Sequence, residues 1–475
     1  MATDRERLQG PGDFILDGAL IVGSSGLRVN VIDQIIELNV YQSLDSPYMS
    51  GNLLISDSAG IAELLPLIGQ ERLLFKFRTP QHEGTVDFND YHAIIYGIKK
   101  RFHTTDREQT YMLNWTTFDH YKNLRVKVSS SFSGTISSIV TDLLRDENYL
   151  GTKKPLHIDI TRNIRKYVIP NMNPFSAINL MKNEAINAEN SPYFVFFENP
   201  EGYHFRSIDS LIGQQGSLNV PHKRTYKFEP PQAGGNPNKD PEITLGTITH
   251  WEAEDNNNSF FNTRHGMYAS TLYYHDIFNK NIQKFEYDYD KDRFNKRQLL
   301  NQENKNVGSL VSGAKIDDKT ITEYTNSKIF VHPTASDNLH TVGTDNNAEE
   351  WLQESRSRAL EKEYFTLKIE TYGDTNIMVG DIINVIIPSN KPMPPQGGRE
   401  VMDPLLSGRY LITELAHQIS PTEQVHQMVM TVMKDSIESA TPVKDLQYKD
   451  PPSGSTDTGL KNVKKTLTPR TKNIS

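Results

Sequence analysis

The stretch from Tyr364 to Asp435 constrains the fold of this chain most strongly. It opens with residues 364–370, in which apolar and polar side chains alternate as they do in a half-buried strand. A nearly continuous apolar run follows at 382–387, and two amphipathic runs, 409–419 and 425–433, are joined by a short polar turn. Read in order, these segments predict a small antiparallel β-barrel or sandwich. They contain no reactive constellation, so we interpret the protein as structural.

A second unit of the same kind is predicted at the N-terminus, over residues 1–119. A short helix is expected at Ile61–Leu65, between strands that are rich in apolar and β-branched residues. The predicted strands cover residues 13–22, 27–42, 53–55, 72–78, 91–102 and 109–118.

The two units are related by a shift of 317 positions. Because a one-residue slip would exchange the two faces of a strand, matched parity favours a duplicated barrel. Any two amphipathic hairpins with equal loops also align in this way, so chance similarity stays an alternative. The shift pairs, without a gap, Ile94 with Leu411, Ile98 with Leu415, Phe102 with Ile419, Thr105 with Thr422, Asp106 with Glu423, Tyr111 with Met428, Leu113 with Met430 and Trp115 with Val432.

A mixed α+β unit is predicted between the barrels, over residues 120–212. An apolar stripe at helical spacing marks residues 136–144, and a second helix is expected to begin at Asn173–Pro174. The aromatic segment 193–205 turns at Asn199–Gly202 and predicts a tight hairpin. We interpret its aromatic side chains as packing on the two helices; a stacking platform for bases or sugars is the alternative.

The remaining segments complete the predicted organisation. Residues 213–241 are rich in Pro, Gly and Asn and predict a linker. Residues 242–345 are a mixed segment of outer body and barrel strands, 346–440 form the second barrel, and 441–475 form an extended tail. The predicted fold class is therefore α+β, mainly β, with two similar tube-like antiparallel β-barrel domains and an inserted α+β body.

Composition excludes several classes of function. The chain of 475 residues has no cysteine, so neither a disulfide nor a thiol nucleophile is available. Its formal net charge of −8 argues against a nucleic-acid binder that works by neutralising phosphates. The sequence shows neither an apolar signal region at its start nor a run of 18 apolar residues. We therefore expect folding in a cytoplasm and no membrane span.

One acidic motif resembles half of a calcium loop. Asp288, Asp290 and Asp292 have the spacing of the first ligands of an EF-hand, but Arg293 and Leu299 stand where glycine and glutamate are required. We interpret the three carboxylates as a solvated strand edge.

The histidines do not form a recognisable site either. His417 and His426 lie on opposite arms of the last hairpin and can face each other; we interpret them as satisfied sheet histidines. No nucleophile elbow or phosphate-binding loop is present, so we predict no catalytic residue, no cofactor and no metal site. The residues that stand out are structural turns: Pro174, Gly202, Gly380, Asp381 and Gly408.

Several segments, in their order and spacing, resemble the baseplate hub protein of contractile-tailed bacteriophages. They are residues 171–181, 193–211, 378–388 and 407–412. The resemblance implies a homotrimer that joins a hexameric tail tube to a trimeric central spike and forms part of the DNA ejection channel. It implies as partners the chain itself, the tail tube protein, the central spike protein, and baseplate wedge or sheath-proximal proteins, but no sequence-specific nucleic acid.

The resemblance also implies a place in the virion, at the tail baseplate, after assembly in the host bacterial cytoplasm. Two alternatives stay open: the hub of a contractile secretion or toxin-injection particle, and a tail-associated cell-wall hydrolase. We further expect an acidic channel wall along which DNA slides, an isolated monomer of low stability, and a tail 441–475 that lies on a neighbouring subunit or on the spike.

Overall fold

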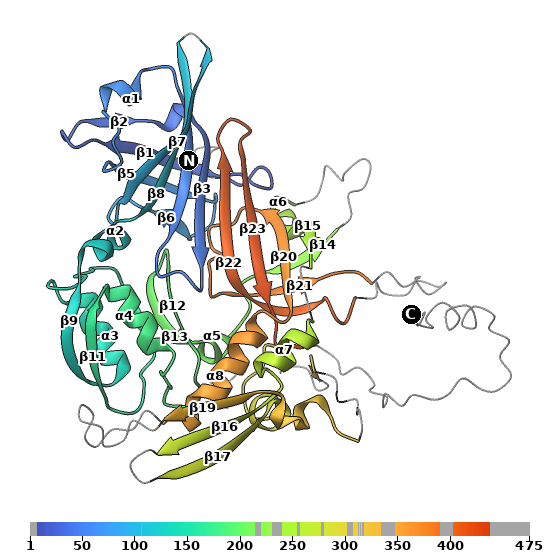
Figure 1. The fold of residues 1–475 in the computed structure, drawn as a ribbon. Coiled ribbons are helices and arrows are strands. Elements are labelled where there is room, and N and C mark those ends of the chain that lie inside the picture. Colours follow the sequence, from blue (N-terminus) through green and yellow to red (C-terminus); the bar gives the residue numbers. More distant parts are fainter. Residues whose placement is uncertain are drawn as a thin grey trace, which may run out of the picture.

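The computed structural model shows two β-barrels side by side, with the remaining units below them in the view of Figure 1. The barrels are joined in one continuous sheet. The structure describes residues 7–105, 107–213, 220–229, 240–253, 257–276, 280–301, 307–311, 313, 315, 318–333, 347–389 and 402–437.

Six strands near the N-terminus form the first barrel, whose core surrounds the buried indole of Trp115. The rings of Phe75 and Phe88 pack against that indole at centroid distances of 5.3 and 5.2 Å. A Cβ at Gly51 would lie 2.5 Å from the indole, so this strand position requires glycine. The barrel comprises β1 (Ile15–Val22), β3 (Ile35–Ser43), β4 (Ser50–Asp57), β5 (Arg72–Arg78), β7 (Ala93–Thr105) and β8 (Glu108–Thr117), with the short strands β2 (Arg28–Asn30) and β6 (Thr85–Asp87) and the helix α1 (Ile61–Leu64).

The single strand predicted over residues 27–42 is wrong. A 3-10 turn, η2 (Ile32–Gln34), separates β2 from β3. The break is visible in the parity of the sequence, because the apolar residues Val29 and Val31 occupy odd positions whereas Leu38 and Val40 occupy even ones. β2 pairs with β1 and β3 pairs with β4.

The second barrel is closed. Its six strands pair in the order β15-β20-β23-β22-β21-β14, and β14 returns to β15. Two of its strands, β14 and β15, lie upstream of the segment 346–440, and β14 falls inside the segment for which the sequence predicts a linker. The barrel comprises β14 (Thr225–Phe228), β15 (Thr247–Glu252), β20 (Thr366–Tyr372), β21 (Ile382–Ile386), β22 (Gly408–Ser420) and β23 (Val425–Met433), with the helix α6 (Pro241–Leu245) between β14 and β15.

The two barrels have the same strand order. Numbered along the chain, the six strands of each barrel lie in the order 2-3-6-5-4-1. β1, β3, β4, β5, β7 and β8 therefore correspond to β14, β15, β20, β21, β22 and β23. One strand departs from this match: β14 runs parallel to β21 and β15, whereas β1 runs antiparallel to β5.

The last two strands of each barrel agree residue by residue over part of their length. Ile94 pairs with Thr116 in the first barrel and Leu411 pairs with Met433 in the second, as the shift of 317 requires. Each hairpin then has a bulge at the same place, Ile95/Gly97 and Ile412/Glu414. The predicted duplication is confirmed by these registers, since chance similarity does not reproduce a bulge.

The correspondence of Phe102 with Ile419 is wrong by one position. β7 has a second bulge between Lys99 and Phe102, which β22 does not have. Phe102 therefore lies opposite Thr110, whereas Ile419 lies opposite His426, one ladder position farther.

The α+β unit follows the first barrel and has its own core. The aromatic side chains of its hairpin pack inward, with Phe194 against Phe205 and Phe196 against Tyr203, so the packing interpretation is confirmed. The unit comprises α2 (Phe118–Arg125), α3 (Ile136–Arg145), α4 (Pro174–Lys182) and α5 (Ile208–Ile212), the pair β9 (Val128–Gly134) and β11 (Arg165–Met172), and the sheet β10 (Leu156–Ile158), β13 (Gly202–Ser207) and β12 (Phe194–Asn199).

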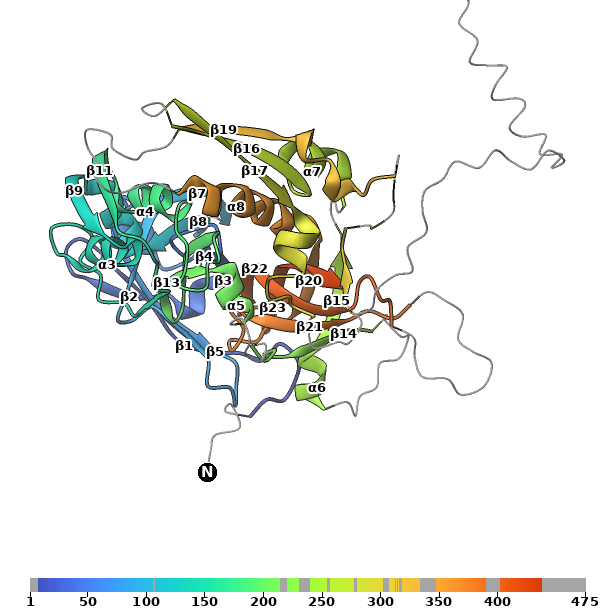
Figure 2. The ribbon, with the colours of Figure 1, turned by 90° about the horizontal axis from the view of Figure 1, so that it is seen from below.

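A third sheet forms the outer body, and the helix that precedes the second barrel packs on it (Figure 2). This helix, α8 (Ala348–Lys362), contacts both β16 and β17. The outer body comprises α7 (Ser259–His265), the sheet β17 (Asn281–Asp288), β16 (Ala269–Asp276) and β19 (Ile329–Pro333), the π-helix η3 (Tyr289–Phe294), the turns η4 (Ile321–Glu323) and η5 (Thr325–Ser327), and the pair β18 (Gly308–Ser309) and β24 (Ser436–Ile437).

Candidate assembly site

The two barrels meet along the strand β22. One edge of β22 pairs with β23 along most of its length, and the other edge is divided between two partners. Residues 408–411 pair with β21 of the same barrel, and residues 414–419 pair antiparallel with residues 38–43 of β3 in the first barrel. The bulge between Ile412 and Glu414 separates these two partnerships, which is where an extra residue redirects a strand.

Side chains continue the junction at the level of the loops. The hydroxyl of Thr375 accepts a hydrogen bond from the amide of Thr79 at 3.0 Å, and the hydroxyl of Thr79 accepts one from the amide of Thr375 at 3.1 Å. The amide of Gly84 donates to Asn376 Oδ1 at 2.7 Å. The loop after β5 and the loop after β20 are therefore locked together by reciprocal hydrogen bonds.

An ion cluster lies beside these loops. The ring of His82 contacts Asp374 Oδ1 at 2.8 Å through Nδ1 and Glu242 Oε2 at 3.1 Å through Nε2. Arg224 contacts the same two carboxylates at 2.9 and 2.8 Å. The hydrogen bond to Asp374 raises the pKa of His82, and although burial opposes it, the contact with His82 lowers the pKa of Asp374. The cluster joins a loop of the first barrel to three segments of the second: the residue before β14, the helix α6 and the loop after β20.

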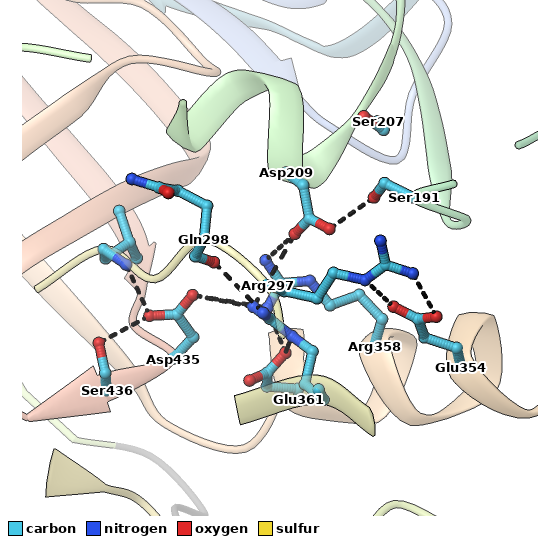
Figure 3. A network of polar contacts seen from close by, with 12 residues as sticks. Ser191, Ser207, Asp209, Arg297, Gln298, Glu354, Arg358, Glu361, Asp435 and Ser436 are labelled. Atoms are coloured by element: carbon cyan, nitrogen blue, oxygen red, sulfur yellow. Dashed lines mark hydrogen bonds and ion pairs between the residues drawn. The ribbon is translucent and has the colours of Figure 1, made fainter. Parts of the chain in front are cut away.

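A larger charge cluster is buried where the second barrel meets the outer body and the α+β unit (Figure 3). Arg293 Nε lies 3.2 Å from Glu361 Oε2, and its Nη2 lies 3.1 Å from Asp435 Oδ2. Arg358 contacts Asp209 at 2.8 Å and also contacts Glu361. The five side chains come from α5, η3, α8 and the turn after β23, so the cluster ties three units of the chain together.

The charges in this cluster do not balance, because two guanidinium groups face three carboxylates. Although burial opposes it, the two arginines lower the pKa values of Glu361 and Asp209. Burial raises the pKa of Asp435, whose Oδ1 accepts the amide of Leu300 at 3.0 Å. Of the three carboxylates, Asp435 is therefore the one for which burial outweighs the two arginines.

A buried ion pair connects the α+β unit to the first barrel. Lys154 contacts Glu198, whose Oε2 accepts the hydroxyl of Thr117 at 2.9 Å and the amide of Met49 at 3.3 Å. Thr117 and Met49 belong to the first barrel, at the end of β8 and before β4. Charged side chains therefore lie where the first barrel meets the second, where the first barrel meets the α+β unit, and where the second barrel meets the outer body.

The five turn residues lie in separate turns and at the starts of separate elements, and they do not converge on a common site. Gly380 has φ +93°, and a Cβ there would lie 3.1 Å from the ring of Phe197. Asp381 closes the same turn, because its carboxylate accepts the amide of Met378 at 3.0 Å. Burial raises the pKa of Asp381 to about 6.

The other three turn residues lie at the starts of elements. Gly408 and Gly202 begin β22 and β13, each with φ +129°. A Cβ at Gly202 would lie 2.4 Å from the carbonyl oxygen of Pro155. Pro174 is the first residue of α4, where its missing N–H has no helical acceptor to lose.

The three carboxylates that have the spacing of EF-hand ligands belong to a helix cap. Asp288 ends β17 and accepts the amides of Asp290 and Lys291 at 3.0 and 3.2 Å, and Asp292 accepts the amide of Asp288 at 3.0 Å. The interpretation as a strand edge is wrong for Asp290 and Asp292, which lie in the π-helix η3. The motif is a capping arrangement.

The histidine pair faces across the hairpin, as the sequence allows. His417 Nδ1 lies 3.0 Å from His426 Nε2, and both rings are fully buried beside Phe77. Burial lowers the pKa of His417 to about 4 and that of His426 well below its usual range. Among the described residues, the second nitrogen of each ring has no hydrogen-bond partner, so the prediction that both rings are satisfied is wrong.

One group in the described part of the chain has residues that could bind a metal. The ligand atoms of His157, Glu201 and His204 lie within 4.8 Å of one another. The rings of His157 and His204 are stacked at 4.5 Å and 17°, and His204 also stacks on Phe197. Because two nearly parallel ring planes cannot both contain one ion, this arrangement is a ring stack. Sequence reasoning missed it, since β10 and β13 pair only in the folded chain.

Comparison with known proteins relates the chain to solved structures. The tail protein from Neisseria meningitidis MC58 is similar with a TM-score of 0.50 at 12% identity, over 89% of this chain and 97% of that chain. The chain has the fold of this tail protein. The resemblance inferred from the sequence is confirmed at the level of this tail-protein fold.

Two further tail proteins are similar at lower scores. The 43 kDa tail protein of prophage MuSo2 from Shewanella oneidensis has a TM-score of 0.49 at 8% identity, covering 88% of this chain and 98% of that chain. The prophage tail protein gp18 from Listeria monocytogenes EGD-e has a TM-score of 0.43 at 10% identity, covering 88% and 94%. No protein-family model matches the sequence, and no curated protein sequence is similar to it. No helix among the described residues has the length and apolar character needed to cross a membrane.

Proposed function

We propose that this protein is the homotrimeric hub of a contractile-tail baseplate, a structural protein that joins the hexameric tail tube to the trimeric central spike. The observation that carries the proposal is the duplication: one chain contains two barrels of the same strand order, joined edge to edge by β22 and β3. Three such chains present six barrels, which match a six-fold ring on one side.

The rest of the chain supports the change from six-fold to three-fold symmetry. The α+β unit and the outer body occur once per chain, so a trimer carries three copies of each beside six barrels. The buried charge clusters fix them to the barrels, which suits a part that transmits force between tube and spike. In this role the partners are the tail tube protein, the central spike protein and neighbouring baseplate proteins, and no enzymatic step is required.

The net charge supports a passage for DNA. Three chains carry a formal charge of about −24, and a wall that does not attract phosphates lets DNA slide without binding. The place of such a hub is the virion baseplate, after assembly in the host bacterial cytoplasm. The tail 441–475, which we expect to lie on a neighbouring subunit or on the spike, is outside the described residues.

The mass and symmetry of the purified protein test the proposal. With a chain mass of 54.0 kDa, sedimentation is expected to give a trimer of about 162 kDa at micromolar concentration. A cryo-EM map is expected to show three-fold symmetry, a ring of six barrels, and a lumen that is not dominated by Lys and Arg. A stable compact monomer, or a ring without a threefold axis, contradicts the proposal. Peptidoglycan cleavage in a zymogram would support the wall-hydrolase alternative instead.

A further inference from the structure

The edge of β7 in the first barrel lacks the cover that its counterpart has in the second. β7 corresponds to β22, and β5 pairs with β7 only at Ala93 and Ile94, just as β21 pairs only with the start of β22. Beyond the shared bulge, β22 is covered by β3, whereas residues 97–105 of β7 have no partner strand on that side among the described residues. An edge strand of this length is a template for pairing with another chain.

The matching acceptor is β15. It corresponds to β3, and both strands have a bulge at the equivalent place, Ile35/Glu37 in β3 and Ile248/His250 in β15. On the side where β3 receives β22, β15 is covered by β14 only at Thr247 and Ile248. In the described part of the chain, residues 249–253 leave this side of β15 unpaired.

The two edges are complementary in chemistry. The exposed part of β7 carries Lys99, Lys100 and Arg101 in succession, and then Phe102, whose side chain is 54% exposed. The end of β15 offers the half-buried ring of Trp251 and the exposed carboxylate of Glu252. A basic, aromatic edge therefore faces an acidic, aromatic one, which favours pairing between the two and disfavours pairing of either with itself.

We infer that β7 of one chain pairs antiparallel with β15 of the next chain, repeating between chains the junction that β22 and β3 form within each chain. The inference rests on the proposed trimer and names its interface. Three junctions within chains and three between chains then close a ring of six barrels. The pair Gln418–Asn39 of the junction within the chain corresponds to Arg101 and Glu252 when the residue shifts between the barrels are applied without a further gap. If the second bulge of β7 is kept in the ring, Phe102 lies opposite Glu252 instead.

Disulfide cross-linking tests the pairing cleanly, because the chain has no cysteine. The test variants are Arg101→Cys/Glu252→Cys and Phe102→Cys/Glu252→Cys. The matched control is Asn39→Cys/Gln418→Cys, at the equivalent pair of the junction within the chain. After oxidation, one of the test variants is expected to give covalent dimers and trimers and nothing larger, whereas the control gives an internal link in a monomer band.

The outcomes separate the interface from the trimer. If sedimentation shows a trimer but neither test variant gives covalent oligomers while the control links, the interface is wrong and the proposed function stands. A protein that sediments as a monomer contradicts both.

A single substitution gives an independent readout. Phe102→Asp is expected to raise the concentration for half-assembly about tenfold or more, because it places a carboxylate at the centre of the junction. The control Ile160→Asp changes a side chain that is also exposed, in the α+β unit, and is expected to leave assembly unchanged. Equal assembly of the two variants would overturn the inference.

Discussion

At the scale of single residues, stability is concentrated in a few buried charges. Arg293 is enclosed by carboxylates from three elements, and its side chain is 1% exposed. Removing it leaves three carboxylates with only Arg358 to compensate them. The cost of burying their charge is then no longer offset, and the folded state is destabilised.

The change Arg293→Met is expected to lower the free energy of unfolding by about 3–5 kcal/mol, measured by urea denaturation. The control Lys291→Met lies on the same helix, where the ion pair with Asp288 is exposed to solvent and is expected to contribute little to stability. Similar losses in the two variants would show that the cluster has no special weight.

The buried Asp381 gives the protein a pH dependence of a definite sign. Its pKa is raised to about 6 by burial, so the folded state holds the proton more tightly than the unfolded state does. The stability that it contributes is complete below about pH 4 and is lost as the pH rises through 6.

In Asp381→Asn this loss should disappear, and the variant should be more stable than the wild type at pH 8 by on the order of 2 kcal/mol. The amide oxygen can still accept the amide of Met378. The control Asp374→Asn should have the opposite effect, because the pKa of Asp374 is lowered and its contribution is present at neutral pH. Urea midpoints between pH 4 and 8 check both signs, and a parallel decline in wild type and Asp381→Asn would contradict the assignment.

At the scale of elements, the counterpart strands β22 and β7 differ in what covers them. Ile419, near the end of β22, is fully buried and packs into the core of the first barrel. Phe102, in the corresponding part of β7, is largely exposed. The corresponding strands therefore differ in role: β22 pairs with the neighbouring barrel of the same chain, whereas this edge of β7 is open.

This difference predicts unequal costs of truncation. Ile419→Ala is expected to destabilise the isolated chain by about 2–5 kcal/mol, through lost burial and the cavity that it leaves. Phe102→Ala is expected to cost less than about 0.5 kcal/mol under conditions in which the protein is monomeric. Denaturation of both variants at low protein concentration provides the measurement; a large cost at Phe102 would mean that its side chain is already buried within the single chain.

Whether an element could be predicted from the sequence depends on how far apart along the chain its partners lie. The long hairpins were predictable, because alternation and turn residues are local, and the shift of 317 related them correctly as far as Lys99. β14 was not, since four residues beside a Pro-rich segment carry no periodic signal and their partners lie far along the chain. The charge cluster was also out of reach, because Asp209 and Asp435 meet only after folding.

At the scale of the whole molecule, the long hairpins of both barrels project in the same direction, toward the top of Figure 1. Parallel orientation of the two barrels is what the proposed ring requires, since every barrel in it would present the same end to the tail tube. The once-per-chain units lie at the other end, where a three-fold partner would be received. Shape and duplication thus support the same assembly.

The reversed direction of β14 has a further consequence. Because it makes the two barrels of one polypeptide unequal, two different barrels would alternate around a closed circle of six. A gene that encodes a single barrel makes all six barrels of such a circle identical. In a gene that encodes two barrels, one mutation changes only every second barrel. Half of the circle can then specialise while the other half keeps its original contacts.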